Sequence, residues 1–159
     1  MTGPEATPLD EPGISLVARR LILAPVERVF AAWTEPERLK RWWGPDSVTC
    51  PDAEVDLRVG GAYRLANRLP DGTIVWITGR FLEIERPRRL VYTWLVGDPS
   101  AESERTRVTV RFEPRAGGTE VIVVHDQIAS AAFRERSRSG WDGCLRGLAD
   151  YFQPGVLGE

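Results

Sequence analysis

The sequence contains few of the residues on which metal binding and covalent catalysis depend. Among its 159 residues there are one histidine and two cysteines, and the 21 basic residues include a single lysine, Lys40. The cysteines, Cys50 and Cys144, form no C-x-x-C pair, whereas a structural zinc site requires four ligands. We therefore predict no metal site, and we expect both thiols to be reduced, as in cytoplasmic proteins.

Long apolar segments and an excess of charge of one sign are also missing. No apolar run approaches the roughly 18 residues that span a bilayer, and residues 1–13 lack the basic and apolar regions of a secretory signal. The formal net charge of −2 gives no general reason to expect a nucleic acid or an anionic membrane as partner. No phosphate-binding or dinucleotide-binding glycine motif occurs, because no helical pattern follows Gly60-Gly61. These absences predict a cytoplasmic protein without a cofactor.

What the sequence does contain is the length and apolar content of one folded domain. Its hydrophobic share of 42% and charged share of 28% are ordinary for globular proteins. A chain of this length can bury one core without disulfides or metals. We expect a flexible tail over residues 1–13, a single domain over residues 14–154 and a flexible C-terminus over residues 155–159.

The first part of this domain is predicted to form a strand and two short helices. Residues 14–23 are apolar and extended in character, and Pro25 suits the first position of a helix. One face of that helix carries apolar residues at helical spacing, namely Val26, Val29, Phe30 and Trp33. Thr34 and Glu37 have the spacing of a capping box, which predicts a second helix that ends at Gly44-Pro45.

The remainder is predicted to form six strands and a long helix. Turn sequences such as Pro70-Asp71-Gly72 separate the strands, which are expected near residues 53–57, 62–69, 73–85, 90–96, 107–113 and 119–125. Residues 131–152 return to helical spacing and have one apolar face. The predicted fold class is α+β, with a curved antiparallel sheet wrapped around a long C-terminal helix.

Several segments, taken in order, resemble the Aha1-type branch of the START-like superfamily, which is also called SRPBCC or Bet v 1-like. They are Ala24-Pro25-x-Glu27-x-Val29-Phe30-x-x-Trp33, Arg41-Trp42-Trp43-Gly44-Pro45, Asp56-Leu57-Arg58-x-Gly60-Gly61, Gly79 before Pro87, Leu90-Val91-Tyr92-Thr93-Trp94, Gly118-Thr119-Glu120 before His125, and Gly140-Trp141 with Leu145 and Leu148. The resemblance implies the helix-grip order β-αα-β6-α and an apolar cavity between the sheet and the long helix.

The same resemblance implies a range of functions. The superfamily uses its cavity for lipids, sterols, polyketides and hormones, and in a minority of members for cyclase, dehydratase or hydrolase chemistry. The eukaryotic protein that names the branch activates the Hsp90 chaperone ATPase, mainly through a separate N-terminal domain. We expect no room for such a domain in this sequence.

The predicted function is therefore the binding of a small apolar or amphipathic molecule between sheet and helix, with no catalytic residues. Six tryptophans supply aromatic surface with polar edges. Glycines at positions 140, 143 and 147 remove side chains from the last helix, which leaves either volume for a ligand or a close approach of a neighbouring segment. The predicted lining residues are Trp43, Arg58, Tyr63, Trp76, His125, Trp141, Leu145 and Leu148.

Several of these residues have a second interpretation. His125 is either a hydrogen-bonded core residue or a general base. Asp56 and Arg58 share one face of a strand, and they form either a polar pair inside the cavity or a solvated surface pair. Trp42 and Trp43 are adjacent on a helix, so one of them is expected to face the cavity mouth or a partner.

Two alternative functions follow from these interpretations. The first is a cyclase or dehydratase that uses His125, Asp56 or Tyr63 as acid–base groups. The second is a chaperone-associated interaction module anchored by exposed indoles of Trp42 and Trp43. The sequence leaves open whether the chain forms a homodimer.

Overall fold

The computed structural model describes residues 14–44, 47–97 and 105–152. Its elements are β2 (Ile14–Ile22), α1 (Val26–Thr34), α2 (Pro36–Trp42), β3 (Thr49–Val55), β4 (Ala62–Arg68), β5 (Ile74–Glu85), β6 (Arg89–Val96), β7 (Arg105–Arg115), β8 (Gly118–Ile128) and α3 (Ala131–Tyr151). This order confirms the predicted helix-grip arrangement. Within these ranges, none of the helices is both long enough and apolar enough to cross a membrane.

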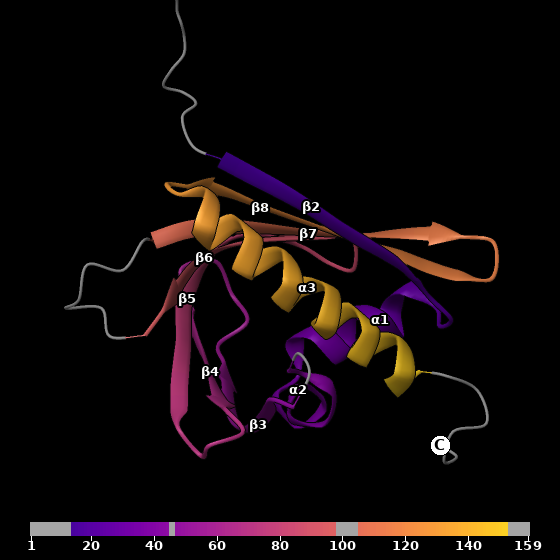
Figure 1. The fold of residues 1–159 in the computed structure, drawn as a ribbon. Coiled ribbons are helices and arrows are strands. Elements are labelled where there is room, and N and C mark those ends of the chain that lie inside the picture. Colours follow the sequence, from indigo (N-terminus) through magenta and orange to yellow (C-terminus); the bar gives the residue numbers. More distant parts are fainter. Residues whose placement is uncertain (1–13, 45–46, 98–104, 153–159) are drawn as a thin grey trace, which may run out of the picture.

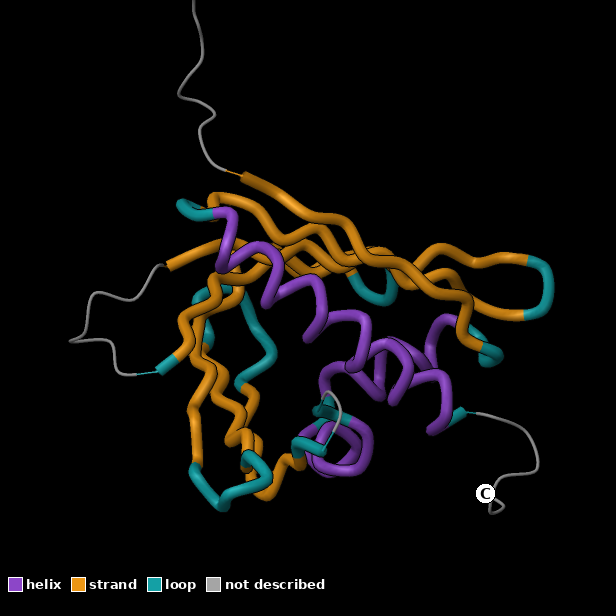
Figure 2. Tube along the Cα trace, in the orientation of Figure 1, coloured by secondary structure: helices purple, strands orange, loops and turns teal. Residues whose placement is uncertain are grey.

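The strands form one antiparallel seven-stranded sheet in the order β2-β8-β7-β6-β5-β4-β3. Strands β3 to β8 are a meander of hairpins, and β2 completes the sheet by pairing with β8, with Val17 opposite Val124. The sheet is strongly bent, because β2, β8 and β7 cross the top of the view while β5, β4 and β3 turn downward (Figure 1). All three helices lie on the concave side of this bend (Figure 2).

The two short helices form for partly different reasons from those predicted. Helix α1 buries its apolar face, including Phe30 and Trp33. The predicted capping box is wrong, because Thr34 is still the last residue of α1 and its hydroxyl donates to Phe30 O at 2.9 Å. Glu35 occupies the N-cap position of α2 without a side-chain cap. Pro36 begins α2 instead, with a φ angle already suited to the first helical turn.

The core lies between the concave face of the sheet and the helices. Alternate residues of each strand point into it, as the two-residue period of a strand requires. Helix α3 runs along the concave side and contributes the apolar face that its spacing predicted. The residues that are fully buried there include Val108, Val110, Phe112, Val121, Val123, Leu145 and Leu148.

Candidate functional site

In the part of the chain that the structure describes, two apolar cavities lie between the sheet and the helices. The larger has a volume of about 200 Å³ and lies between the N-terminal half of α3 and strands β4, β5 and β6. Its lining residues are Trp43, Asn67, Ile77, Trp94, Val96, Phe133, Arg136, Ser137, Gly140, Trp141 and Cys144. The smaller has a volume of about 30 Å³, which is little more than the space of one water molecule. Trp43 and Trp94 line both cavities and therefore separate them.

A cluster of five indoles lies in the space that the bent sheet leaves. The ring centroids of Trp94 and Trp141 are 5.0 Å apart, and those of Trp43 and Trp141 are 5.7 Å apart. Trp33 stacks on Trp141 at 6.1 Å, and Trp42 lies 5.1 Å from Trp33. Three of these tryptophans, Trp43, Trp94 and Trp141, form part of the wall of the larger cavity beside α3.

Trp42 and Trp43 are both buried, with 4% and 5% of their surfaces exposed. Two adjacent positions can both point inward because α2 ends at Trp42 and the backbone of Trp43 is extended, with φ −70° and ψ 138°. The Trp42 indole N–H donates to Ala32 O at 2.8 Å, whereas Trp43 lines the larger cavity. The exposure that was expected of these indoles as an interaction anchor is therefore not found.

His125 lies at the centre of a buried hydrogen-bond chain. Trp141 Nε1–H donates to His125 Nδ1 at 3.1 Å, so this nitrogen carries no proton and the ring proton must be on Nε2. His125 Nε2–H then donates to Thr106 Oγ1 at 2.6 Å, and the Thr106 hydroxyl donates to Trp94 O at 3.3 Å. The chain holds the indole of Trp141 and the backbone of Trp94, two of the residues that line the larger cavity.

This environment keeps His125 neutral. Burial lowers its pKa from 6.5 to about 4, although the neighbouring Asp126 carboxylate acts in the opposite direction. Both ring nitrogens are occupied, and His125 lines neither interior cavity. The structure therefore places it as a hydrogen-bonded core residue that supports the cavity wall, and as a poor candidate for a general base.

Tyr63 lies on the inner face of β4 and lines the smaller cavity. Its ring crosses Gly79 on the paired strand β5, and its hydroxyl donates to Thr93 O on β6 at 2.6 Å. Any side chain at position 79 would overlap that carbonyl and the tyrosine ring. Burial raises the pKa of Tyr63 well above its usual range, so its hydroxyl is a bound donor and not an available acid–base group.

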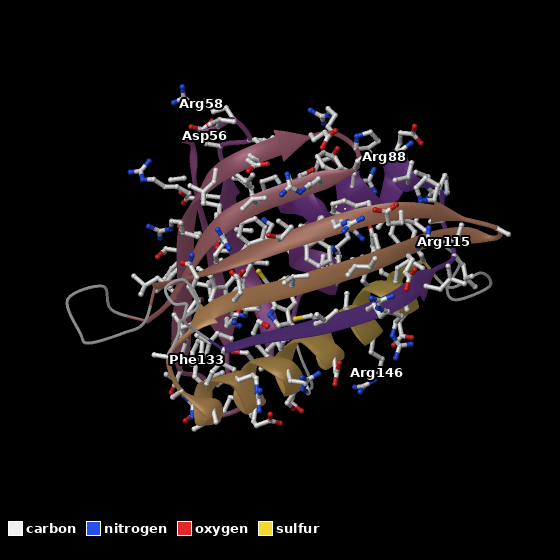
Figure 3. The ribbon with its side chains drawn as sticks, turned by 90° about the horizontal axis from the view of Figure 1, so that it is seen from above. Asp56, Arg58, Arg88, Arg115, Phe133 and Arg146 are labelled. Atoms are coloured by element: carbon white, nitrogen blue, oxygen red, sulfur yellow. The ribbon has the colours of Figure 1, made fainter. Side chains whose placement is uncertain are left out.

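Two predicted lining residues point away from the interior. Trp76 lies on the outer face of the sheet, because its neighbour Ile77 is the inward residue, and the Arg64 guanidinium lies 4.0 Å from its ring centre. Arg58 follows the end of β3 and pairs with Asp56 at 2.9 Å, with 76% of its side chain exposed. Figure 3 shows both members of this ion pair on the opposite side of the molecule from α3. The surface interpretation of the pair is the correct one.

Leu145 and Leu148 also lie outside the lining of the two interior cavities, because they pack into the core with 1% and 0% of their surfaces exposed. Of the predicted set, Trp43 and Trp141 line the larger cavity and Tyr63 lines the smaller one. That any of them contacts a ligand remains a prediction.

Comparison with known proteins agrees with this geometry. The profile of the family described as activator of Hsp90 ATPase homolog 1-like protein matches residues 23–153. The chain belongs to this family. No curated protein matches the sequence, whereas solved structures of relatives superpose over most of both chains.

Three structures illustrate how closely the Aha1-type fold is kept. A protein from Chromobacterium violaceum is 30% identical, with a TM-score of 0.79 over 88% of this chain and 97% of its own. One from Nitrosomonas europaea is 25% identical, with a TM-score of 0.75 over 87% and 94%. The AHSA1 protein from Silicibacter pomeroyi is 24% identical, with a TM-score of 0.76 over 86% and 95%.

In this member of the Aha1-type family, the cavity has lining residues outside the predicted set, although Gly140 was already identified as a position that leaves either volume for a ligand or a close approach. Phe133, Arg136, Ser137, Gly140 and Cys144 form one stripe along α3, at the three- and four-residue spacing of a helix face. This spacing could have identified the helix residues of the lining from the sequence, because they lie on the same face of α3 as Trp141. Asn67, Ile77 and Val96 on the strands had no comparable signal, since alternation does not show which face is concave.

The ionisable groups of this Aha1-type cavity are few. Among the lining residues that the structure describes there is no carboxylate, lysine or histidine, and the ionisable groups are the Arg136 guanidinium and the Cys144 thiol. Burial raises the pKa of Cys144 to about 12, so the thiol stays protonated at neutral pH. Across the described ranges, no three potential metal-ligating side chains form a group that could hold an ion. Asp56, Tyr63 and His125 do not meet in this cavity either.

Two glycines of α3 have opposite environments, which predicts opposite effects of the same substitution. A methyl group at Gly140 would meet no atom within 4 Å, whereas one at Gly147 would lie 2.8 Å from the backbone oxygen of Trp42. We expect Gly140→Ala to raise the free energy of unfolding by about 0.5–1 kcal/mol through helix propensity. We expect Gly147→Ala to lower it by about 1–3 kcal/mol, because α2 must move away from α3. Urea denaturation of both variants checks the signs, and a shift in the same direction for both would contradict this difference.

Proposed function

We propose that the protein binds a small apolar or amphipathic molecule in the cavity of about 200 Å³ beside α3. The observation that supports this proposal most directly is the open space at Gly140, where the helix carries no side chain and no neighbouring atom fills the gap. An apolar cavity of about 150 Å³ is sufficient for benzene. Drug-sized ligands occupy cavities of about 300–1,000 Å³. The expected ligand therefore has one or two rings and is smaller than a sterol.

The shape of the cavity also supports binding of an amphipathic molecule. Its inner wall consists of indoles and aliphatic side chains, whereas Arg136 at its other end is exposed and Ser137 is half-buried. A ligand could thus bury an apolar ring and keep a polar group near the surface.

Binding is favoured over catalysis because the candidate acid–base groups are already occupied or lie elsewhere. The two nitrogens of His125 and the hydroxyl of Tyr63 have protein partners, and Asp56 is at the surface. The burial of Trp42 and Trp43 removes the surface on which a chaperone-anchoring role rested. A cytoplasmic location is part of this proposal, and the two free, buried cysteines support it.

The proposal is tested by filling the cavity. We expect neutral one- and two-ring aromatic compounds to quench tryptophan fluorescence and to raise the melting temperature of the unmodified protein. Gly140→Leu should abolish both effects because the added side chain enters the cavity. Ser139→Leu is the matched control, since Ser139 is the preceding residue of α3 and is exposed to solvent.

Sterols, fatty acids, flavonoids and polyketides complete the ligand panel, and the larger ones are expected to bind weakly or not at all. The proposal fails if no compound binds, or if Gly140→Leu and Ser139→Leu bind the aromatic compounds equally well.

A further inference from the structure

The polar side chains that line the larger cavity include two strong hydrogen-bond donors, the Arg136 guanidinium and the Asn67 amide. The described lining residues include no carboxylate. Their one side-chain amide, Asn67, has its oxygen engaged by Trp43 Nε1–H at 3.0 Å. That bond identifies which end of the amide is the oxygen. Among the described residues, no acceptor lies within hydrogen-bonding distance of Asn67 Nδ2, so the group that the amide retains for a ligand is its NH₂.

Arg136 adds a positive charge at the outer end of the same cavity. Its guanidinium lies 5.7 Å from the ring centre of Phe133, which is itself a lining residue. In the part of the chain that the structure describes, no carboxylate lies within ion-pair distance of Arg136. This distinguishes it from Arg134 on the same helix, which pairs with Glu135 at 3.2 Å. None of the described residues therefore neutralises the charge at the cavity.

The inner walls are suited to a flat ring. The indoles of Trp94 and Trp141 lie 5.0 Å apart at 40°, and Trp43 stands nearly perpendicular to Trp141 at 87°. The first contact is tilted and the second is edge-to-face, and an additional aromatic ring would favour offset or edge-to-face contacts with these indoles. Planar carboxylates are also the groups that a guanidinium binds best, because its parallel N–H groups match two oxygens.

From these three observations we propose that the cavity selects a flat aromatic carboxylate of one or two rings. The ring lies among Trp43, Trp94 and Trp141, the carboxylate is paired with Arg136, and the Asn67 amide offers a further donor. This inference depends on the proposed function, since it names the chemical class of ligand for the same cavity. Arg136 is then the residue that determines the preference for an anion.

The test compares three ligands that share one ring system and differ only in charge: 2-naphthoate, the neutral 2-naphthamide and the cationic 2-naphthylmethylamine. Titration calorimetry at low salt is expected to show 2-naphthoate binding about fivefold more tightly than the amide, the advantage of one partly exposed ion pair. The amine should bind most weakly. Raising the salt concentration should reduce the advantage of the carboxylate, because Arg136 is exposed.

Arg136→Gln should remove the preference and bring 2-naphthoate within about twofold of the amide, whereas Arg134→Gln should leave it intact. Melting temperatures of both variants verify that the fold is kept. If the three ligands bind equally, or if Arg136→Gln keeps the preference, the carboxylate assignment is overturned while the proposed binding function stands. If none of the three ligands binds to the unmodified protein, the carboxylate assignment is overturned, and the proposed function is overturned as well if the wider ligand panel also fails to bind.

Discussion

Replacing His125 by alanine is expected to lower the free energy of unfolding by about 3–5 kcal/mol. The substitution leaves the buried N–H of Trp141 without its acceptor, which costs about 1–3 kcal/mol. It also leaves an empty volume where the fully buried imidazole lay, and large-to-small substitutions in cores add a cavity term of similar size. Urea denaturation followed by circular dichroism measures the loss.

Two further variants separate the loss of the hydrogen bond from the effect of the empty volume left by the imidazole. His125→Asn keeps a carbonyl oxygen close to the position of Nδ1 and should recover part of the stability by accepting from Trp141. A double-mutant cycle of His125→Ala with Trp141→Phe should give a coupling energy of about 1 kcal/mol or more, as residues in direct hydrogen-bond contact do. A His125→Ala loss below about 1 kcal/mol, or a coupling near zero, would show that the buried chain does not stabilise the fold.

Acidification from pH 7 to pH 5 is expected to destabilise the protein by about 2 kcal/mol through His125 alone. In the unfolded chain this imidazole binds a proton below its ordinary pKa of 6.5, whereas in the folded protein it does so only near pH 4. Between these values the unfolded state binds more protons than the folded state. The contribution of His125 to the free energy of unfolding is therefore complete above pH 6.5 and falls as the pH decreases toward 4. The full loss across this window is about 3 kcal/mol, at 1.36 kcal/mol for each unit of pKa difference.

Acid destabilises the folded protein because of the direction of the hydrogen bond between Trp141 and His125. A proton on His125 Nδ1 would face the indole N–H, so protonation requires that bond to break. The measurement is the free energy of unfolding at several pH values for the unmodified protein and for His125→Asn. The variant lacks the titrating ring and should lose about 2 kcal/mol less between pH 7 and pH 5. Parallel pH profiles for the two proteins would refute the assignment.

The fold could be predicted from the sequence because its determinants are local and repeated. The two-residue period of Val108, Val110 and Phe112 and the helical spacing of residues 131–152 each follow from which side chains avoid water. Turn residues such as Gly72 mark where the strands end. The prediction of a capping box at Thr34 was wrong because a threonine hydroxyl can either cap the helix that follows it or donate to the carbonyl four residues earlier in the helix that precedes it. Here it donates to Phe30 O.

The site was harder to predict because strand periodicity divides residues into two faces without naming the inner one. Trp76 and Ile77 are equally apolar neighbours, and only the packed helices make Ile77 the lining residue and Trp76 an outer one. Trp43 points inward because its backbone leaves the helix at that residue. The helix face was predictable, since Gly140 and Trp141 lie on the stripe that α3 presents to the cavity.

The sequence by itself determined the order of elements, the family and the surplus of aromatic residues, because these depend on composition and on spacing along the chain. Only the tertiary structure decided how much space those aromatic residues leave, since packing in three dimensions determines whether a missing side chain is replaced by a neighbour. At Gly147 the backbone of Trp42 takes that space, and at Gly140 nothing does. The open space at Gly140 is part of the cavity beside α3.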